Sequence, residues 1–279
     1  MASSQEIEVG SFAPSGRTLS LPSSIRVVDW NINRGLRLTG VIEFLARSKA
    51  DVIILQEVDL NARRTLQINV AREISRKLEM NYAFGREFQE LAQGSRTSPA
   101  YHGQATLSRW PLSNPRILRF QRQSSFWRPR WFVPEIAPFQ ERIGGRMALV
   151  CDVCIARRTL VTYNLHLESR GDDNLRCAQL DECLDDARRY KSDTPIVLAG
   201  DLNLDVYRSA AADALRRAQF RLIPQNQVVP TTPSHSLFER GRPIDWMFTR
   251  GSRRAQNFEV HNSVAASDHY PLSLTVALT

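Results

Sequence analysis

The chain has 279 residues, of which 42% are hydrophobic and 24% are charged. These proportions are typical of a globular protein and exclude a largely disordered chain, and a domain of this size buries about three quarters of the surface that its unfolded chain exposes. The formal net charge of +8 favours polyanionic partners such as nucleic acids. Almost all of the basic residues are arginines, however, a skew that genomic base composition could also produce.

Residues 1–24 lack the apolar core of a signal peptide, so we predict a flexible lead-in followed by a single domain over residues 25–279. No apolar run approaches the ~18 residues of a membrane-spanning helix. The expected compartment is the cytoplasm, with no stable membrane association. We expect no obligate protein partner, since one chain of this kind can close its own site.

Predicted strands and helices alternate along the chain, without a low-complexity tract or a strong short repeat. Strands are predicted over residues 25–32, 52–56, 104–108, 147–155, 160–165, 196–200, 245–249 and 272–277. Helices are predicted over residues 40–48, 70–78, 174–190 and 209–218. Some strands are apolar throughout, as expected when both faces of a sheet are covered. Two packed sheets with helices outside would account for so many strands in one domain.

The four cysteines do not indicate a disulfide framework in a chain of this length. Cys151 and Cys154 fall on opposite faces of a predicted strand, because successive strand residues alternate between faces. Cys177 and Cys183 fall on different faces of a predicted helix. Four thiolates therefore do not converge on a zinc ion, and ordinary packing is the expected role of each.

Polar residues that can bind a metal or transfer protons follow several apolar runs. In chain order they are Asn31, Glu57, His166, Asp201 with Asn203, and Asp268 with His269. Strands that finish on such groups place them along one rim of a sheet, where clefts form. A polar residue entering a turn is the ordinary interpretation of any one of them, but the whole set indicates a hydrolytic metal site. Hard cations such as Mg²⁺ need only one or two carboxylates, because they keep several waters.

Two of these motifs indicate hydrolysis of a phosphoester. In AGDLN, Asp201 could hold or deprotonate the attacking water. Asn203 points the same way two residues later in extended chain and could donate to a phosphoryl oxygen. In SDH, Asp268 and His269 add a carboxylate and an imidazole at the entrance to another strand.

Five motifs in this order, WNIN, LQEV, GDLN, IDWMF and SDH, resemble those of the endonuclease/exonuclease/phosphatase family, the metal-dependent phosphoesterases with the DNase I-like fold. The similarity spans residues 25–277. It implies a four-layered α/β sandwich of two packed, mixed β-sheets flanked by helices, with the site at one end of the sheets. It also implies Mg²⁺ as the cofactor, with Mn²⁺ as the alternative.

The resemblance assigns metal-binding roles to three residues. Glu57 is similar to the family's principal magnesium ligand, Asn31 lies beside it, and Asp268 matches an auxiliary carboxylate of the metal site.

The resemblance also assigns catalytic roles. Asp201 is similar to the residue that orients or activates water, and Asn203 to the phosphate donor. Asp245 matches the acidic partner of the catalytic histidine, which would be His269. A carboxylate opposite an imidazole holds it in one tautomer and favours its protonated form.

Other aromatic and imidazole residues bear on the subfamily. His166, in NLHLES, resembles the second histidine of DNase I-like, sphingomyelinase-like and 5′-tyrosyl-DNA phosphodiesterase-like members. Tyr101 resembles the family's phosphate-contacting tyrosine, with a packed aromatic ring as the equally weighted alternative. His102, His235 and His261 are interpreted as incidental.

The segment between residues 116 and 146 interleaves arginines with aromatic residues. Its candidates for substrate binding are Trp127, Arg128, Arg130 and Trp131. Arginines over phosphates with aromatics stacked on bases would hold single-stranded nucleic acid. A lid folded back onto the sheet is an equal alternative. Membrane contact is a weaker one, because prolines interrupt any amphipathic helix.

The sequence therefore predicts a Mg²⁺-dependent phosphodiesterase, most directly a nuclease or a DNA end-processing enzyme such as a 5′-tyrosyl-DNA phosphodiesterase. One alternative is a phosphoesterase acting on a lipid or a small phosphorylated molecule. Another is a non-catalytic binding member of the family. DNA or RNA, endonuclease or exonuclease action, one or two metals and the oligomeric state stay open.

Overall fold

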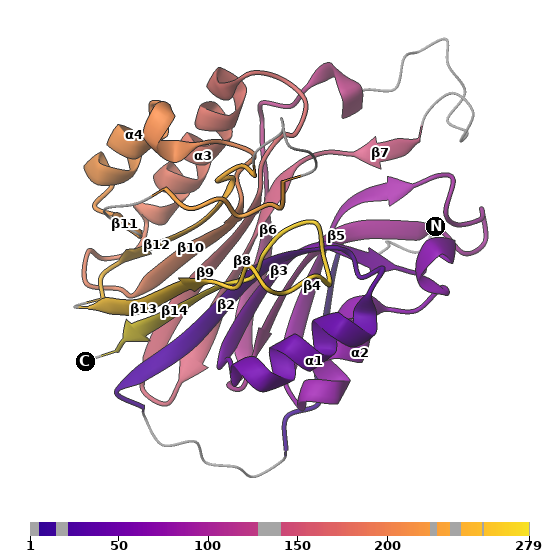
Figure 1. The fold of residues 1–279 in the computed structure, drawn as a ribbon, viewed down its shortest axis with the longest axis horizontal. Coiled ribbons are helices and arrows are strands. Elements are labelled where there is room, and N and C mark those ends of the chain that lie inside the picture. Colours follow the sequence, from indigo (N-terminus) through magenta and orange to yellow (C-terminus); the bar gives the residue numbers. More distant parts are fainter. Residues whose placement is uncertain are drawn as a thin grey trace.

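The computed structural model describes residues 6–14, 22–127, 141–223, 228–234, 241–252 and 254–278. Its framework is two β-sheets packed face to face (Figure 1). The first sheet runs in the order β1 (Ile7–Ser11), β4 (Asn81–Glu90), β5 (Ala100–Ser108), β3 (Val52–Leu60), β2 (Ser24–Arg34), β14 (Leu272–Ala277) and β13 (Ala255–Val260), and β7 (Arg142–Gly144) pairs with β4. The second sheet runs in the order β11 (Arg221–Ile223), β12 (Asp245–Arg250), β10 (Ile196–Asp201), β9 (Arg158–His166), β8 (Met147–Ile155) and β6 (Leu112–Arg119).

Both sheets are mixed, because β2 and β3 pair in parallel in the first sheet and β9 and β10 do so in the second. Helices cover the outer faces (Figure 1). Helices α1 (Leu38–Ser48) and α2 (Val70–Leu78) cover the first sheet, and α3 (Asp173–Ala187) and α4 (Ala211–Arg217) cover the second. Short 3₁₀ turns are η1 (Arg63–Thr65), η2 (Ser125–Trp127) and η3 (Val206–Arg208). The predicted four-layered sandwich is confirmed.

Strand alternation sends neighbouring side chains into different apolar layers. Val28 belongs to the apolar layer that includes Phe44 of α1, on the outer face of the first sheet, whereas Val27 belongs to the layer between the sheets that includes Val197. Each fully buried side chain of this size stabilises the fold by about 1.5–3 kcal/mol. Because both faces of each sheet are covered, the strands read as nearly continuous apolar runs.

Asn164 of β9 joins the two sheets through buried hydrogen bonds. Its Nδ2 donates to the carbonyl oxygens of Leu55 at 2.9 Å and Ala105 at 3.0 Å, and its Oδ1 accepts from Nε2 of Gln56 at 2.9 Å. Buried polar groups that are fully paired in this way specify one relative position of the sheets.

Several predicted elements have the observed bounds, namely β8, β14 and α2. Helix α3 ends at Ala187, three residues before the predicted end at Tyr190, because the next residues form i→i+3 hydrogen bonds of a tighter turn. The strands that the sequence did not predict are β1, β4, β6, β7, β11 and β13. Their sequences contain proline or many polar residues. These residues obscure the alternation of apolar and polar positions by which an edge strand, or a strand that lines a site, could be predicted.

Residues 7–11 correct the predicted lead-in, because they form β1 and pair with β4 at the edge of the first sheet. Glu8 accepts a hydrogen bond of 2.6 Å from the hydroxyl of Tyr82 and one of 2.7 Å from Asn69. The free edge of β4 and these side-chain contacts explain why the segment is part of the sheet.

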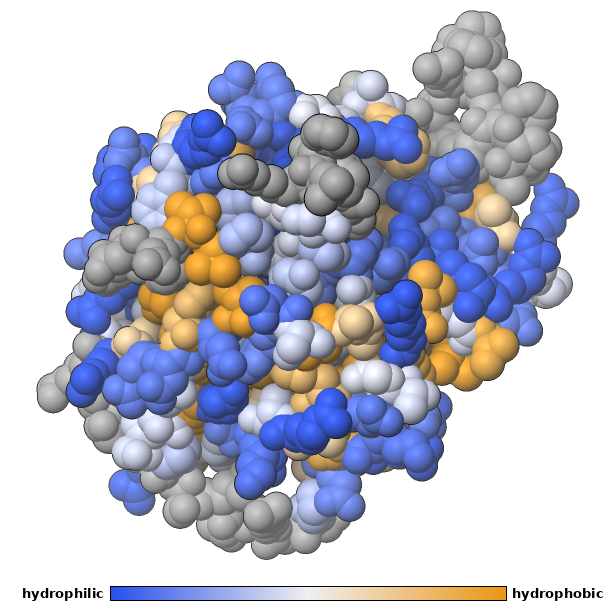
Figure 2. Space-filling model, viewed as in Figure 1, coloured by the Kyte–Doolittle hydropathy of each residue, from blue (hydrophilic) through white to orange (hydrophobic). Residues whose placement is uncertain are grey.

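The cysteines are free thiols, as predicted. Within the described ranges, no helix is both long and apolar enough to cross a membrane. Hydrophilic residues cover most of the face drawn in Figure 2, and hydrophobic residues appear on it as separate patches.

Candidate active site

Three neighbouring strands of the second sheet present ionisable side chains in one row. Asp201, the last residue of β10, pairs in register with His166 of parallel β9 and with Asp245 of antiparallel β12. Neighbouring strands lie about 4.8 Å apart, so the three side chains can act on one bound group. All three residues are almost completely buried.

The first sheet departs from regular pairing at two glutamates. The register shifts across Glu57 in β3 and across Glu87 in β4. Such β-bulges re-aim side chains and are frequent next to active sites. Glu57 has a φ of 50°, in the left-handed region that few non-glycine residues adopt. The sequence predicted that this strand would end before Glu57, but the strand passes through the bulge and continues to Leu60.

His269 and Asp245 form a tightly matched pair. Nδ1 of His269 lies 2.9 Å from both carboxylate oxygens of Asp245, and the hydroxyl of Thr231 donates to Oδ2 of the same carboxylate at 2.5 Å. Burial disfavours the imidazolium, but the carboxylates of Asp245 and Asp201 outweigh burial and raise the pKa of His269 to about 10. His269 is therefore protonated at neutral pH, with its Nε2 3.8 Å from Oδ2 of Asp201.

Two asparagines hold the carboxylate of Asp201 in place. Nδ2 of Asn31 donates to Oδ2 of Asp201 at 3.1 Å, and the backbone N–H of Asn203 donates to Oδ1 at 2.9 Å. Asn203 has a φ of 50°, and its side-chain amide lies 3.3 Å from the carbonyl oxygen of Leu167. Asn31 therefore orients Asp201 in addition to the metal role predicted for it.

The predicted metal ligands lie on β2, β3 and the loop before β14. Glu57 has one-fifth of its side chain exposed, and Nη1 of Arg34 lies 3.5 Å from its Oε2. Burial alone would raise the pKa of Glu57, but the charges of His102, His166 and Arg34 hold it far below its ordinary value. The carboxylate of Glu57 is therefore ionised at neutral pH.

The loop that carries Asp268 is fastened to β2. The hydroxyl of Ser267 donates to the carbonyl oxygen of Asn31 at 2.7 Å and lies 3.2 Å from Oδ1 of exposed Asp268. Glu57, Asn31 and Asp268 offer only oxygen donors, and oxygen donors suit a hard cation such as Mg²⁺. This donor set therefore fits the metal that the resemblance implies.

Arg146 and Glu87 surround His166. Nη1 of Arg146 lies 2.9 Å from each ring nitrogen of His166 and donates to Oε1 of Glu87 at 2.6 Å. Burial would raise the pKa of Glu87, but Arg146 and His166 outweigh it and lower this pKa to about 2. Nε2 of His166 lies 3.8 Å from Oδ2 of Asp201, so this group adjoins the aspartate.

The predicted substrate-binding residues occupy different environments. Trp127 is 4% exposed, and its indole N–H donates to Oε2 of Glu168 at 2.7 Å. Tyr101 is half-buried on β5, with the guanidinium of Arg86 4.2 Å from its ring centroid. Arg128, Arg130 and Trp131 lie outside the described residues, as does His235. His261 contacts the hydroxyl of Ser273 at 2.9 Å, away from the row.

Sequence reasoning missed Glu87 and Arg146 and set His102 aside. Glu87 lies in β4, which the sequence did not predict as a strand. Arg146 ends the segment in which arginines and aromatic residues alternate, where no motif singles it out. His102 is 2% exposed, and its Nδ1 lies 3.1 Å from Oδ1 of Asp59. The available signal was the placement of charged residues between apolar ones, in GREF and in GGRMALV.

The fold and this site together define a hydrolytic phosphoesterase. The model of the Endonuclease/Exonuclease/phosphatase family matches residues 30–269, and the chain belongs to this family. Its members are metal-dependent, hydrolytic phosphoesterases. No curated protein matches the chain in sequence.

Solved structures share the fold. The endonuclease/exonuclease/phosphatase from Bacteroides vulgatus is 16% identical, with 92% of this chain and 100% of that chain covered and a TM-score of 0.68. The corresponding protein from Beutenbergia cavernae DSM 12333 is 17% identical, with 92% and 72% covered and a TM-score of 0.66. TDP2 from Caenorhabditis elegans is 18% identical, with 94% and 78% covered and a TM-score of 0.63. At these identities the likeness concerns the fold alone.

Proposed function

We propose that the protein is a Mg²⁺-dependent phosphodiesterase that hydrolyses nucleic acid, as a nuclease or as an enzyme that processes DNA ends. The observation that carries this proposal is the buried Asp245–His269 pair, which faces Asp201. Hydrogen bonds from Asn31 and Asn203 hold the carboxylate of Asp201 in place. The net charge of +8 supports a polyanionic substrate. The HLES motif, which resembles that of 5′-tyrosyl-DNA phosphodiesterases, supports action at a DNA end.

Glu57, Asn31 and Asp268 would hold the Mg²⁺ ion. When bound, the ion supplies positive charge that offsets the charge developing on the phosphoryl oxygens and on the leaving oxygen. Glu57 suits this role because its carboxylate is ionised and partly exposed. The oxygen donors disfavour a soft metal at this position.

Asp201 would orient the attacking water and accept its proton. Both of its oxygens are fixed by hydrogen bonds from Asn31 and Asn203, so the direction of approach is set before the substrate arrives. A positioned group that moves a proton contributes about 10²–10⁴ to the rate.

The two histidines would act on the phosphate from separate strands. Protonated His269 would donate from Nε2 to a non-bridging oxygen, since its Nδ1 is occupied by Asp245. His166 and Arg146 would contact the phosphate from the other side of Asp201 and stabilise the pentacovalent transition state.

Cleavage assays with an aspartate variant test this proposal. The purified protein is incubated with labelled single- and double-stranded DNA and RNA, with 5′-tyrosyl DNA and with sphingomyelin, each with Mg²⁺, Mn²⁺ or chelator. We expect Mg²⁺-dependent cleavage of a nucleic acid and a loss of at least about 100-fold in Asp201→Ala. The matched control is Asp213→Ala, because Asp213 is exposed on α4 and pairs with Arg216 at 2.7 Å.

The outcomes separate the alternatives. If the protein cleaves only sphingomyelin, the proposed substrate changes from a nucleic acid to a lipid. Binding of nucleic acid without cleavage of any substrate would favour the non-catalytic interpretation. Near-wild-type cleavage by Asp201→Ala would contradict the role of Asp201.

A further inference from the structure

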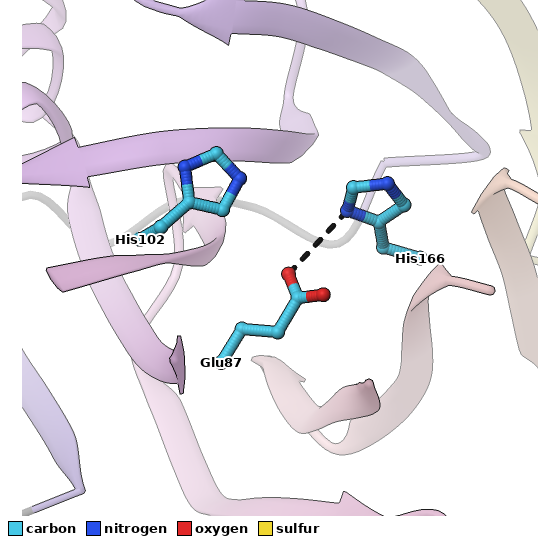
Figure 3. A group of neighbouring side chains, drawn as sticks. All are labelled: Glu87, His102 and His166. Atoms are coloured by element: carbon cyan, nitrogen blue, oxygen red, sulfur yellow. Dashed lines mark ion pairs between the residues drawn. The ribbon is translucent and has the colours of Figure 1, made fainter. Parts of the chain in front are cut away.

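Three buried side chains from three strands converge between the sheets, next to the site already described. They are Glu87 of β4, His102 of β5 and His166 of β9, and Figure 3 shows both imidazole rings and the carboxylate around a common space. Each offers a ligand atom, and these atoms lie within 4.8 Å of one another. His102 has no part in the proposed hydrolysis, so the cluster requires its own explanation.

The orientation of His102 is the first argument for a ligand. Its Nδ1 lies 3.1 Å from Oδ1 of Asp59, and Asp59 is itself held by Nε of Arg64 at 2.7 Å and Nη2 at 2.8 Å. In the neutral form of His102, donation of the Nδ1 hydrogen to this carboxylate leaves a lone pair on Nε2. Metal-binding histidines are held in this way, by a carboxylate on the nitrogen that does not bind the metal.

The weakly paired oxygen Oε2 of Glu87 is the second argument. Arg146 donates to Oε1 of Glu87, but Oε2 is buried and accepts no hydrogen bond among the described residues. This side of the carboxylate faces His166, whose Nδ1 lies 3.4 Å from Oε2 (Figure 3). This ion pair is long and Oε2 accepts no hydrogen bond among the described residues, so a cation would satisfy the buried oxygen better.

We propose that Glu87, His102 and His166 form a second cation site, for a transition-metal ion of the Zn²⁺ or Co²⁺ type. Two imidazoles and a carboxylate are ligands that such ions prefer, whereas Mg²⁺ prefers oxygen alone. Ligand distances of about 2.0–2.2 Å require the three side chains to close in on the ion. A fourth ligand would be water or a phosphate oxygen.

Arg146 is the competing cation at this site. Its guanidinium contacts Oε1 of Glu87 and both ring nitrogens of His166. The ion must therefore bind Glu87 through Oε2 and compete with Arg146 for His166. An occupied site would draw His166 away from the phosphate. The bound ion therefore inhibits hydrolysis. This inhibition rests on the proposed function, whereas the existence of the cation site is independent of it.

Binding is measured on the full chain by equilibrium dialysis with Zn²⁺ in a large excess of Mg²⁺, which keeps the oxygen-donor site filled. We expect one Zn²⁺ per chain. His102→Gln and Glu87→Gln should each weaken binding at least about 10-fold, and Asp59→Asn should weaken it by about 10–100-fold. Glu57→Gln, which alters the proposed Mg²⁺ site, should bind Zn²⁺ like the wild type. Circular dichroism identifies variants that fold, and either folded ligand variant suffices for the comparison.

Co²⁺ gives an independent readout, because its absorption spectrum distinguishes nitrogen and oxygen ligands from cysteine sulfur. We expect a spectrum without sulfur-to-metal charge transfer that disappears in His102→Gln. No Zn²⁺ bound in excess Mg²⁺, or binding lost in Glu57→Gln and kept in His102→Gln, would overturn the site. Zn²⁺ that binds without slowing Mg²⁺-dependent hydrolysis would overturn the inhibitory consequence and leave the proposed function intact.

Discussion

Neighbouring carboxylates, rather than solvent, stabilise the protonated form of the His269 imidazole. Asp245 holds Nδ1, Asp201 faces Nε2, and together they overcome the cost of burying an imidazolium. Asp201 in turn depends on Asn31, which donates to the oxygen nearest to His269. Each of these residues is therefore tuned by a partner on another strand, and the effects of their substitutions will not be additive.

The pair predicts a pH dependence of stability in the metal-free protein. The pKa of His269 rises from an ordinary 6.5 to about 10 on folding, so its stabilising contribution is complete below pH 6.5 and is lost as the pH rises towards 10. Denaturant unfolding between pH 6 and 10 should show the free energy of unfolding falling over this window. In His269→Gln this part of the fall should disappear.

His261→Gln is the matched control for this measurement. Burial lowers the pKa of His261, so its contribution changes below pH 6.5 and not above it. The wild-type slope should therefore persist in this variant. An unchanged slope in His269→Gln would mean that the Asp245–His269 pair is not an ion pair in solution.

At the scale of elements, the ends of β-strands supply most residues of the site, and β-bulges set the direction of two of its side chains. The central buried strands were predicted because apolar, β-branched runs such as VIIL and PIVLAG have few other uses. The bulges at Glu57 and Glu87 could not be predicted, because a bulge depends on the pairing of a strand with its neighbour and not on its own residues. For the same reason, the sequence identified Asp201, Asp245 and His269 through their motifs but missed Arg146, whose partners come from other strands.

Gly200 permits the close approach of β9 and β10. It has a φ of 147°, and an added Cβ would lie 1.9 Å from the carbonyl oxygen of Leu165. Gly200→Ala should therefore separate His166 from Asp201 and lower activity. The backbone strain alone should destabilise the protein by about 1–3 kcal/mol. Thermal unfolding should show a decrease of roughly 2–4 °C for each kcal/mol.

Gly40→Ala is the corresponding control within helix α1. The added methyl would meet only Cβ of Ala266, at 3.0 Å, and the helix would gain propensity. The midpoint of thermal unfolding should change much less in Gly40→Ala than in Gly200→Ala. Equal losses of stability in both variants would contradict the special role of the β9–β10 contact.

At the scale of the whole molecule, the net charge of +8 acts together with a site rich in carboxylates. The buried carboxylates of Asp245 and Glu87 are paired locally with His269 and Arg146. A net positive charge attracts polyanions over distances longer than a direct contact.

If nucleic acid is the substrate, this charge makes its binding depend on salt. The dissociation constant of Asp201→Ala for single-stranded DNA, measured by fluorescence anisotropy, should rise with salt as counterions are released. Six to ten phosphate contacts would weaken binding by about 10³–10⁵ between 50 and 200 mM salt. Affinity that does not change with salt would argue against tracking of a phosphate backbone.

The strands that meet at the site come from distant parts of the chain. The indole N–H of Trp30 donates to the carbonyl oxygen of His269 at 2.9 Å across 239 positions, and β2 pairs directly with β14. A ribosome-bound chain that has not yet exposed β14 therefore has Asn31 and Glu57 but no His269 to complete them. The proposed site therefore stays incomplete during synthesis until β14 has paired with β2 and brought His269 to Asp245.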